Sequence, residues 1–132
     1  MKTIRILILE DDLETLSVLL NRLHDLEEKI APVMIAVAIL SEYTQVEDYI
    51  NRTNKIIFDV ILLDRDCKAG GSFHVLDIKK FGIDKIIGIS SIPPYNEQLR
   101  QAGVKSLIHK DFVNLDLFAD KVINEIIRVL RL

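Results

Sequence analysis

The sequence has little of what marks several large classes of protein. Its one cysteine, Cys67, cannot form an internal disulfide, which favours a reducing compartment such as the cytoplasm. The apolar stretch near the N-terminus has only about six residues, too short for a signal peptide or for crossing a bilayer. A net charge of −3 gives no general basic surface for nucleic acid. The sequence therefore predicts a cytoplasmic protein with no membrane partner and no direct nucleic-acid partner.

Glycine and proline are also scarce, with five and three residues, and they do not gather into a linker between domains. A chain of 132 residues suffices for one domain with a single core, and 49% hydrophobic with 28% charged residues is typical of a globular protein. We therefore expect residues 1–132 to form one domain, with no output domain on this chain.

Short apolar runs alternate with amphipathic stretches along the chain. The runs predict strands at residues 4–9, 33–40, 58–63, 85–89 and 104–109. The stretches with helical spacing cover residues 13–26, 41–54, 73–81, 96–102 and 115–130. Five strands alternating with five helices predict an α/β fold. It is a flavodoxin-like, doubly wound, five-stranded parallel sheet of order 2-1-3-4-5 with helices on both faces.

Single residues mark where several of these helices begin and end. Asp12 is a suitable N-cap for the first helix, and Gly82 and Gly103 are suitable to end the third and fourth. Pro93 and Pro94 are expected to delay or shorten the fourth helix, because proline disfavours helical backbone in the residue before it and inside a helix.

Acidic residues follow two strands that are neighbours in this order. The first strand ends at Glu10 and Asp11, and the third ends at Asp64. Ligands in such sheets bind beyond the carboxyl ends of the strands, so these carboxylates are expected to meet on one rim. Crowded carboxylates raise one another's pKa unless a cation is present, and hard oxygen ligands suit Mg²⁺. The alternative is that each acid only caps a helix or keeps a loop soluble.

A hydroxyl and an amine are expected at the same rim, since Ser90 follows the fourth strand and Lys110 the fifth. An aspartate such as Asp64 can attack a phosphoryl group and form an acyl phosphate. A metal ion, a lysine and a hydroxyl would neutralise the charge on the oxygens of that group. The pattern predicts Asp64, Ser90 and Lys110 as the residues that carry out phosphoryl transfer.

These motifs resemble those of response-regulator receiver domains of bacterial two-component signalling, over essentially the whole chain. They are the acids of ILILEDD, the aspartate of FDVILLD, the hydroxyl of IIGISS, the AG of RQAGV and the lysine of SLIHKD. The resemblance implies a stand-alone phosphorelay switch, phosphorylated on Asp64 by a sensor histidine kinase or a histidine phosphotransfer protein. Such a domain catalyses its own phosphorylation and dephosphorylation and acts through a separate downstream effector protein.

The resemblance also implies a set of ligands for Mg²⁺. Asp11 and Asp64 would bind the metal directly, Glu10 mainly through water, and Asp66 through its backbone carbonyl. The side chain of Asp66 has two open interpretations: it tunes the lifetime of the phosphoryl group, or it is a solvated loop acid.

The sequence departs from the receiver pattern at two positions near Lys110. Receivers usually have proline after this lysine, often in a cis bond, but here Asp111 follows. A cis bond before a residue other than proline costs roughly 2.5–4 kcal/mol, so the bond is expected to be trans or the loop strained. Three residues before the lysine, the usual aromatic ring that swings inward on activation is replaced by Leu107. These departures leave the way in which phosphorylation is transmitted open.

The last helix has apolar residues over roughly half of its circumference at 3.6 residues per turn. The excess at Ile123, Ile127 and Leu130 indicates either a homodimer or partner surface, or simply a wide core face. Cys67 is expected to be a small buried residue rather than a reactive thiol.

Two other functions fit parts of the sequence. Asp64-Arg65-Asp66 resembles the DxD pair of haloacid-dehalogenase-like phosphatases, but there the motif lies on a first strand near the N-terminus. The departures at Leu107 and Asp111 are also compatible with a binding module that has the receiver fold and is not phosphorylated.

Overall fold

The computed structural model describes residues 2–132 and contains the predicted sheet. Its five parallel strands have the order β2-β1-β3-β4-β5. The strands are β1 (Thr3–Leu9), β2 (Met34–Leu40), β3 (Val60–Leu63), β4 (Ile86–Gly88) and β5 (Ser106–Leu107). The flavodoxin-like order predicted from the sequence is therefore confirmed.

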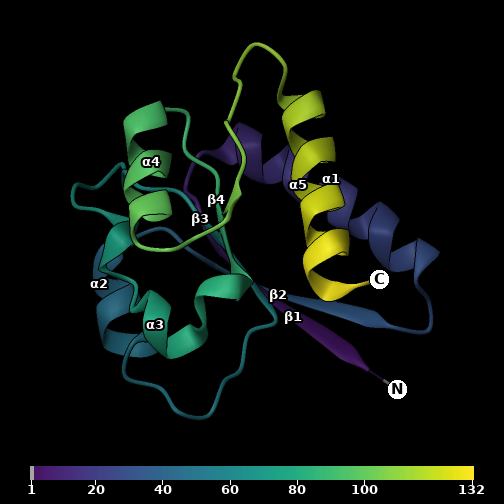
Figure 1. Ribbon diagram of the computed structural model, residues 1–132. Coiled ribbons are helices and arrows are strands. Elements are labelled where there is room, and N and C mark those ends of the chain that lie inside the picture. Colours follow the sequence, from purple (N-terminus) through teal and green to yellow (C-terminus); the bar gives the residue numbers. More distant parts are fainter. Residues whose placement is uncertain (1) are drawn as a thin grey trace.

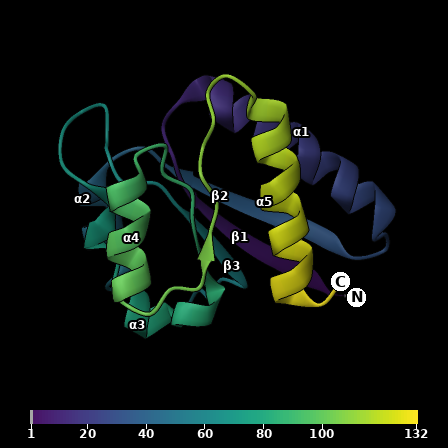
Figure 2. The same cartoon turned by 45° about the horizontal axis from the view of Figure 1, so that its top comes forward.

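Helices cover both faces of this sheet (Figures 1 and 2). On one face, α1 (Leu13–Lys29) and α5 (Leu115–Leu130) lie side by side. The other face carries α2 (Tyr43–Gln45), α3 (Ile78–Phe81) and α4 (Pro93–Gln101). A parallel sheet covered in this way buries both surfaces of its strands, which is why the strand sequences are almost continuously apolar.

The core consists of two layers, one on each face. Alternate residues of β1 point to opposite faces, so Ile6 and Ile8 pack with α1 and α5 while Leu7 and Leu9 pack on the other side. All four residues of β3 are fully buried. The central strands are therefore fixed from both sides, and the residues that follow them are held at defined positions.

Capping residues determine where the two long helices begin. The Asp12 carboxylate accepts a hydrogen bond from the Thr15 N–H at 2.9 Å, and the Asn114 side chain accepts one from the Leu117 N–H at 3.1 Å. Each bond satisfies an N–H that has no partner within its helix. The predicted N-cap of α1 and both ends of α5 are confirmed.

Two predicted helices are shorter than expected or interrupted. The segment 41–54 forms α2 followed by a π-helical turn, Val46–Ile50. The segment 73–81 is not one helix: a 3-10 turn, Phe73–Val75, ends before α3 begins. The interruption lies at Asp77, whose side chain accepts from the Lys80 N–H at 3.2 Å and so starts a new helix.

The prediction that two prolines delay the fourth helix is wrong. Pro93 is the first residue of α4, where the N–H that proline lacks would have no partner inside the helix. Its fixed φ angle also suits this position, so the helix starts three residues earlier than the predicted start at residue 96.

The apolar face of α5 is wide because it reaches the core over much of its circumference. Ile123, Ile127 and Leu130 are partly buried and pack against the core layer shared with α1. This contact accounts for part of their apolar character. Whether they also contact a second copy of the chain stays a prediction.

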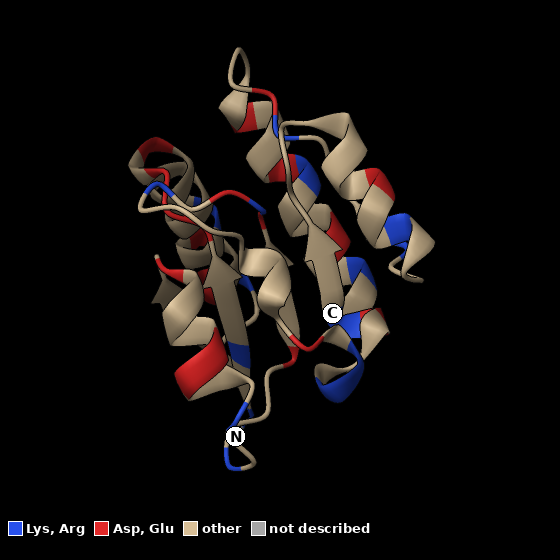
Figure 3. Cartoon of the chain, turned by 90° about the vertical axis from the view of Figure 1, so that its left-hand side faces the viewer, with Lys and Arg blue, Asp and Glu red and all other residues tan. Residues whose placement is uncertain are grey.

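Charged residues of both signs occur throughout the chain, with 17 Lys and Arg and 20 Asp and Glu. Figure 3 shows acidic and basic segments interspersed along the chain, without a face of one sign in that view. In residues 2–132, no helix has both the length and the apolar character needed to cross a bilayer.

Candidate functional site

The strand register brings the predicted site residues to one edge of the sheet. Leu9 pairs with Leu63, Leu63 with Gly88, and Gly88 with Leu107. The residues that follow these strands therefore lie in neighbouring positions beyond the carboxyl edge. The Asp64 N–H donates to the Leu9 carbonyl at 3.0 Å.

Lys110 contacts two of the predicted carboxylates directly. Its Nζ donates to Glu10 Oε1 and, at 3.2 Å, to Asp64 Oδ2. All three residues are buried, with 0% of Glu10, 3% of Lys110 and 8% of Asp64 exposed. The prediction that these side chains share one rim agrees with their contacts.

The electrostatics of this group follow from burial and from crowding. Burial and the nearby charge of Asp64 raise the pKa of Glu10 to about 7, although Lys110 opposes the rise. Burial lowers the pKa of Lys110, but the two carboxylates outweigh this and raise it above its ordinary value. The lysine is therefore a permanent positive charge between two acids, one of which releases its proton near neutral pH.

Asp11 and Asp66 differ in where their side chains point. Asp11 is half-buried, and its Oδ2 accepts a hydrogen bond from the Lys68 N–H at 2.7 Å. The Asp66 carboxylate is exposed and pairs with Arg65 Nη1 at 3.0 Å. The carboxylate of Asp66 therefore points toward Arg65. That its backbone carbonyl faces a metal stays a prediction from the receiver resemblance.

The donors at this edge fit a hard cation. Glu10 and Asp64 share a single lysine, and Asp11 adds a third carboxylate, so negative charge exceeds positive charge at this edge of the sheet. Burial is the main cause of the raised pKa of Glu10, and the nearby charge of Asp64 adds to it. Oxygen ligands with surplus negative charge are those that Mg²⁺ binds in proteins.

Ser90 lies on the far side of Asp64 from Glu10. It is 2% exposed, and its Oγ accepts a hydrogen bond from the Ile92 N–H at 3.1 Å. The Lys110 N–H donates to the Ser90 carbonyl at 3.1 Å, which fixes β5 beside β4 at the site. The hydroxyl and the amine predicted from the sequence therefore lie in the segments that follow two adjacent strands, β4 and β5.

Sequence reasoning missed two residues beside the site. Asn96 is buried on α4 and forms hydrogen bonds with the backbone at Ser90 and Ile108. The Phe112 ring lies 5.2 Å from Lys110 Nζ, on the loop that follows this lysine. A polar residue at a predicted helix start gave no sign that it would be buried, and one aromatic residue in a loop has many possible positions.

The departures from the receiver pattern have visible structural results. The Lys110–Asp111 bond is trans, since Ala31–Pro32 is the one cis bond in residues 2–132. Leu107 is partly buried and packs in the core layer under α4. The trans alternative given for the loop is thus correct.

Cys67 lies next to the acidic residues but is buried, as predicted. Burial, with a smaller contribution from the charge of Asp11, raises the pKa of its thiol to about 11. A thiol with so high a pKa carries almost no thiolate at neutral pH and is a poor nucleophile.

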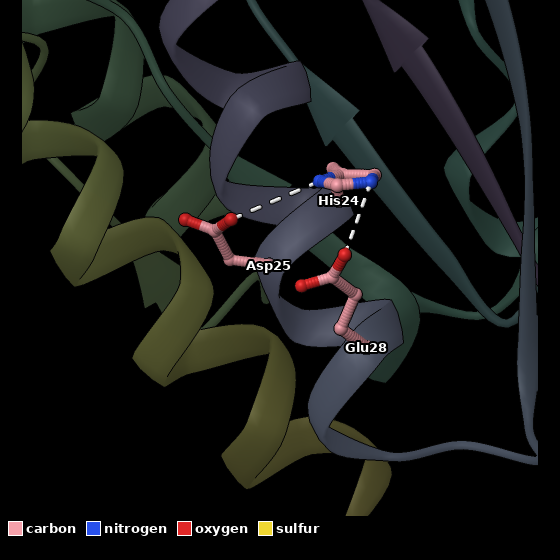
Figure 4. A group of neighbouring side chains, drawn as sticks. All are labelled: His24, Asp25 and Glu28. Atoms are coloured by element: carbon pink, nitrogen blue, oxygen red, sulfur yellow. Dashed lines mark ion pairs between the residues drawn. The ribbon is translucent and has the colours of Figure 1, made fainter.

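Within the part of the chain described, one group of three acidic or histidine side chains has ligand atoms that all lie within 4.8 Å of one another, and it lies elsewhere. His24, Asp25 and Glu28 sit exposed on α1 (Figure 4). His24 Nδ1 lies 3.8 Å from Asp25 Oδ1, and His24 Nε2 lies 3.5 Å from Glu28 Oε1. They are near the C-terminal end of α1, whereas the predicted site adjoins its N-terminal end. They are ordinary exposed ion pairs on a helix surface.

Comparison of the sequence with models of protein families and with characterised proteins finds no match. Comparison of the structure does find similar folds. The sheet order, the helix layers and the position of the acidic edge define a receiver fold, the fold of response-regulator receiver domains. One solved structure with this fold is a bacteriophytochrome response regulator, RtBRR. It matches 98% of this chain and 79% of its own, with 20% sequence identity and a TM-score of 0.66.

Proposed function

We propose that the protein is a phosphorylation-dependent signalling switch that accepts a phosphoryl group on Asp64. The observation that carries the proposal is the contact of Lys110 with both Glu10 and Asp64 at the carboxyl edge of a receiver fold. A lysine held against a buried aspartate, beside two further acids and a hydroxyl, suits phosphoryl transfer to a carboxylate, because the lysine and the hydroxyl can stabilise the charge on the transferred group.

Asp64 is suited to act as the nucleophile. One oxygen, Oδ2, accepts from Lys110 at 3.2 Å. The side chain keeps 12% of its surface exposed, so a phosphoryl donor can reach it. Attack by a carboxylate oxygen on the phosphorus of a phosphohistidine forms the P–O bond and breaks the P–N bond. The electron pair of that bond leaves with the imidazole nitrogen.

The other site residues neutralise charge on the transferred group. The Ser90 hydroxyl, beyond β4, and Lys110, beyond β5, would donate to its oxygens, because both lie on the same side of Asp64 and Lys110 already contacts it. Glu10, Asp11, Asp64 and the Asp66 carbonyl would hold Mg²⁺. When bound, this ion offsets the repulsion between the carboxylates and the incoming phosphoryl oxygens.

The partners follow from the same chemistry. The phosphoryl donor would be a sensor histidine kinase or a histidine phosphotransfer protein, in the cytoplasm. The phosphorylated chain would act by binding a separate effector protein. A homodimer through α5 would be one further contact. The domain would catalyse its own phosphorylation and the later hydrolysis of the acyl phosphate.

The test is incubation with acetyl phosphate and Mg²⁺, followed by intact-mass spectrometry and phosphate release. We expect one phosphoryl group per chain, absent in Asp64→Asn and retained in Asp84→Asn, a matched control at an exposed acid outside the site. Omission of Mg²⁺ should abolish the adduct. Steady phosphate release from many phosphate esters would instead indicate a phosphatase. An unmodified chain under all these conditions would indicate a binding module that is not phosphorylated.

A further inference from the structure

The side chain of Asn96 ties α4 to the ends of two strands. Asn96 is 8% exposed. Its Oδ1 accepts from the Ser90 N–H at 3.2 Å, and its Nδ2 donates to the carbonyls of Ser90 at 3.4 Å and Ile108 at 3.3 Å. One buried amide therefore connects the helix to the residue expected to bind a phosphoryl oxygen and to the strand that leads to Lys110.

A second contact joins Ser90 to the beginning of the same helix. Ile92 is the N-cap residue of α4, and its apolar side chain cannot cap the helix. Its N–H donates instead to Ser90 Oγ at 3.1 Å. A Ser90 hydroxyl that moves toward Asp64 must leave this N–H or draw the start of α4 with it.

Tight packing makes α4 sensitive to small movements of β4. A Cβ atom at Gly88 would lie 2.7 Å from Leu99 Cδ1, 2.9 Å from Leu107 Cδ2 and 3.0 Å from Asn96 Oδ1. The helix thus rests against bare backbone, with no side chain between them to absorb a displacement. Leu107 fills this contact where a receiver usually has its mobile aromatic ring, so transmission by ring rotation is absent here.

A third contact joins α4 to the residue that follows Asp64. The Arg65 guanidinium lies 4.0 Å from the centre of the Tyr95 ring, within cation–π distance. Arg65 directly follows Asp64, and Tyr95 directly precedes Asn96. Two consecutive residues of α4, Tyr95 and Asn96, are therefore in contact with the segments that follow β3, β4 and β5.

From these contacts we infer that Asn96 is a positioning residue that couples the state of Ser90 to the position of α4. The inference rests on the proposed function, since it needs a phosphoryl group on Asp64 to move Ser90. When Ser90 is drawn toward that group, its backbone pulls on the Asn96 amide and displaces α4. The displacement of α4 would change the surface available to a partner protein. This movement would replace the rotation of an aromatic ring at position 107.

The test uses the full chain with Mg²⁺ and beryllium fluoride as the phosphoryl mimic, and follows backbone amide shifts by NMR. In the wild type, we expect shifts at Ser90, at Lys110 and along residues 97–101 of α4. In Asn96→Ala, we expect the shifts at Ser90 and Lys110 to persist and those along α4 to fall to less than half. Gln98→Ala, an exposed change on the same helix, should keep the full α4 response.

Asn96→Asp keeps the acceptor for the Ser90 N–H and removes both donors, so it provides a second variant should the alanine variant not fold. It should also lose at least half of the α4 response. A purely structural role for Asn96 would lower the melting temperature with and without the mimic but leave the α4 response intact, and that result would overturn the inference. So would a wild type that responds at Ser90 and Lys110 but not in α4. A wild type without any response would overturn the proposed function, and the inference with it.

Discussion

The raised pKa of Glu10 predicts a specific pH dependence of stability. Its carboxyl has a pKa of about 7 in the folded protein, against an ordinary value of 4.5. Between these two pH values the folded state binds more protons than the unfolded state, so the free energy of unfolding falls as pH rises. This shift in the pKa of Glu10 corresponds to a contribution of about 3 kcal/mol to the free energy of unfolding. That contribution is lost between about pH 4.5 and pH 7 and is absent at higher pH.

Glu10→Gln isolates this contribution, because the amide has nearly the same shape as the protonated acid and does not titrate. Urea unfolding of both proteins is measured from pH 5 to pH 8 with a chelator present. We expect the two free energies of unfolding to lie closest at pH 5 and the variant to gain on the wild type toward pH 8, by up to about 3 kcal/mol. Glu14→Gln, at an exposed acid in the first turn of α1, should follow the wild type.

Magnesium supplies the second half of this prediction. If Mg²⁺ binds at the acidic edge, its affinity should rise as pH rises through 7, because the cation replaces the proton on Glu10. Addition of Mg²⁺ at pH 8 should then restore stability to the wild type and much less to Glu10→Gln. Parallel pH profiles for wild type and Glu10→Gln would refute the reasoning, since they would mean that Glu10 has an ordinary pKa.

Three shorter predictions concern neighbouring residues. Lys110→Met leaves two buried carboxylates without their positive partner and should cost about 3–5 kcal/mol by urea unfolding at pH 8, less at pH 5. Cys67 should react with a thiol reagent much more slowly in the folded protein than in urea, because burial raises its pKa to about 11; equal rates would contradict this. Gly71→Ala should cost at least about 1 kcal/mol more than Gly70→Ala. Both residues have positive φ, but only at Gly71 would the new Cβ overlap the Tyr43 ring. Similar melting temperatures for the two variants would contradict that difference.

Much of the fold could be predicted because its signals are local. The limits of α5 were predicted from one apolar period, which is readable within a few residues. The strand order followed from the alternation of strands and helices. The segment 73–81 was harder, because Asp77 can either continue a helix or cap a new one. That choice depends on tertiary packing, which local propensity does not contain.

The candidate site was predictable as a set of residues but not as a set of contacts. The acids, Ser90 and Lys110 were expected on one rim because they follow neighbouring strands. That Lys110 contacts Glu10 as well as Asp64 depends on side-chain directions across three strands. Asn96 was missed because its partners are backbone groups, which every residue possesses and which therefore leave no pattern in the sequence.

The bare backbone at Gly88 offers a way to test the proposed switch without phosphorylation. Because α4 is positioned by the lack of a side chain beneath it, one added methyl group would act as a wedge under the helix. Gly88→Ala would push α4 outward while leaving the acidic edge chemically unchanged. In this variant α4 would be displaced without phosphorylation. A partner protein that binds the Gly88→Ala variant more tightly than the wild type would show that the partner contacts α4.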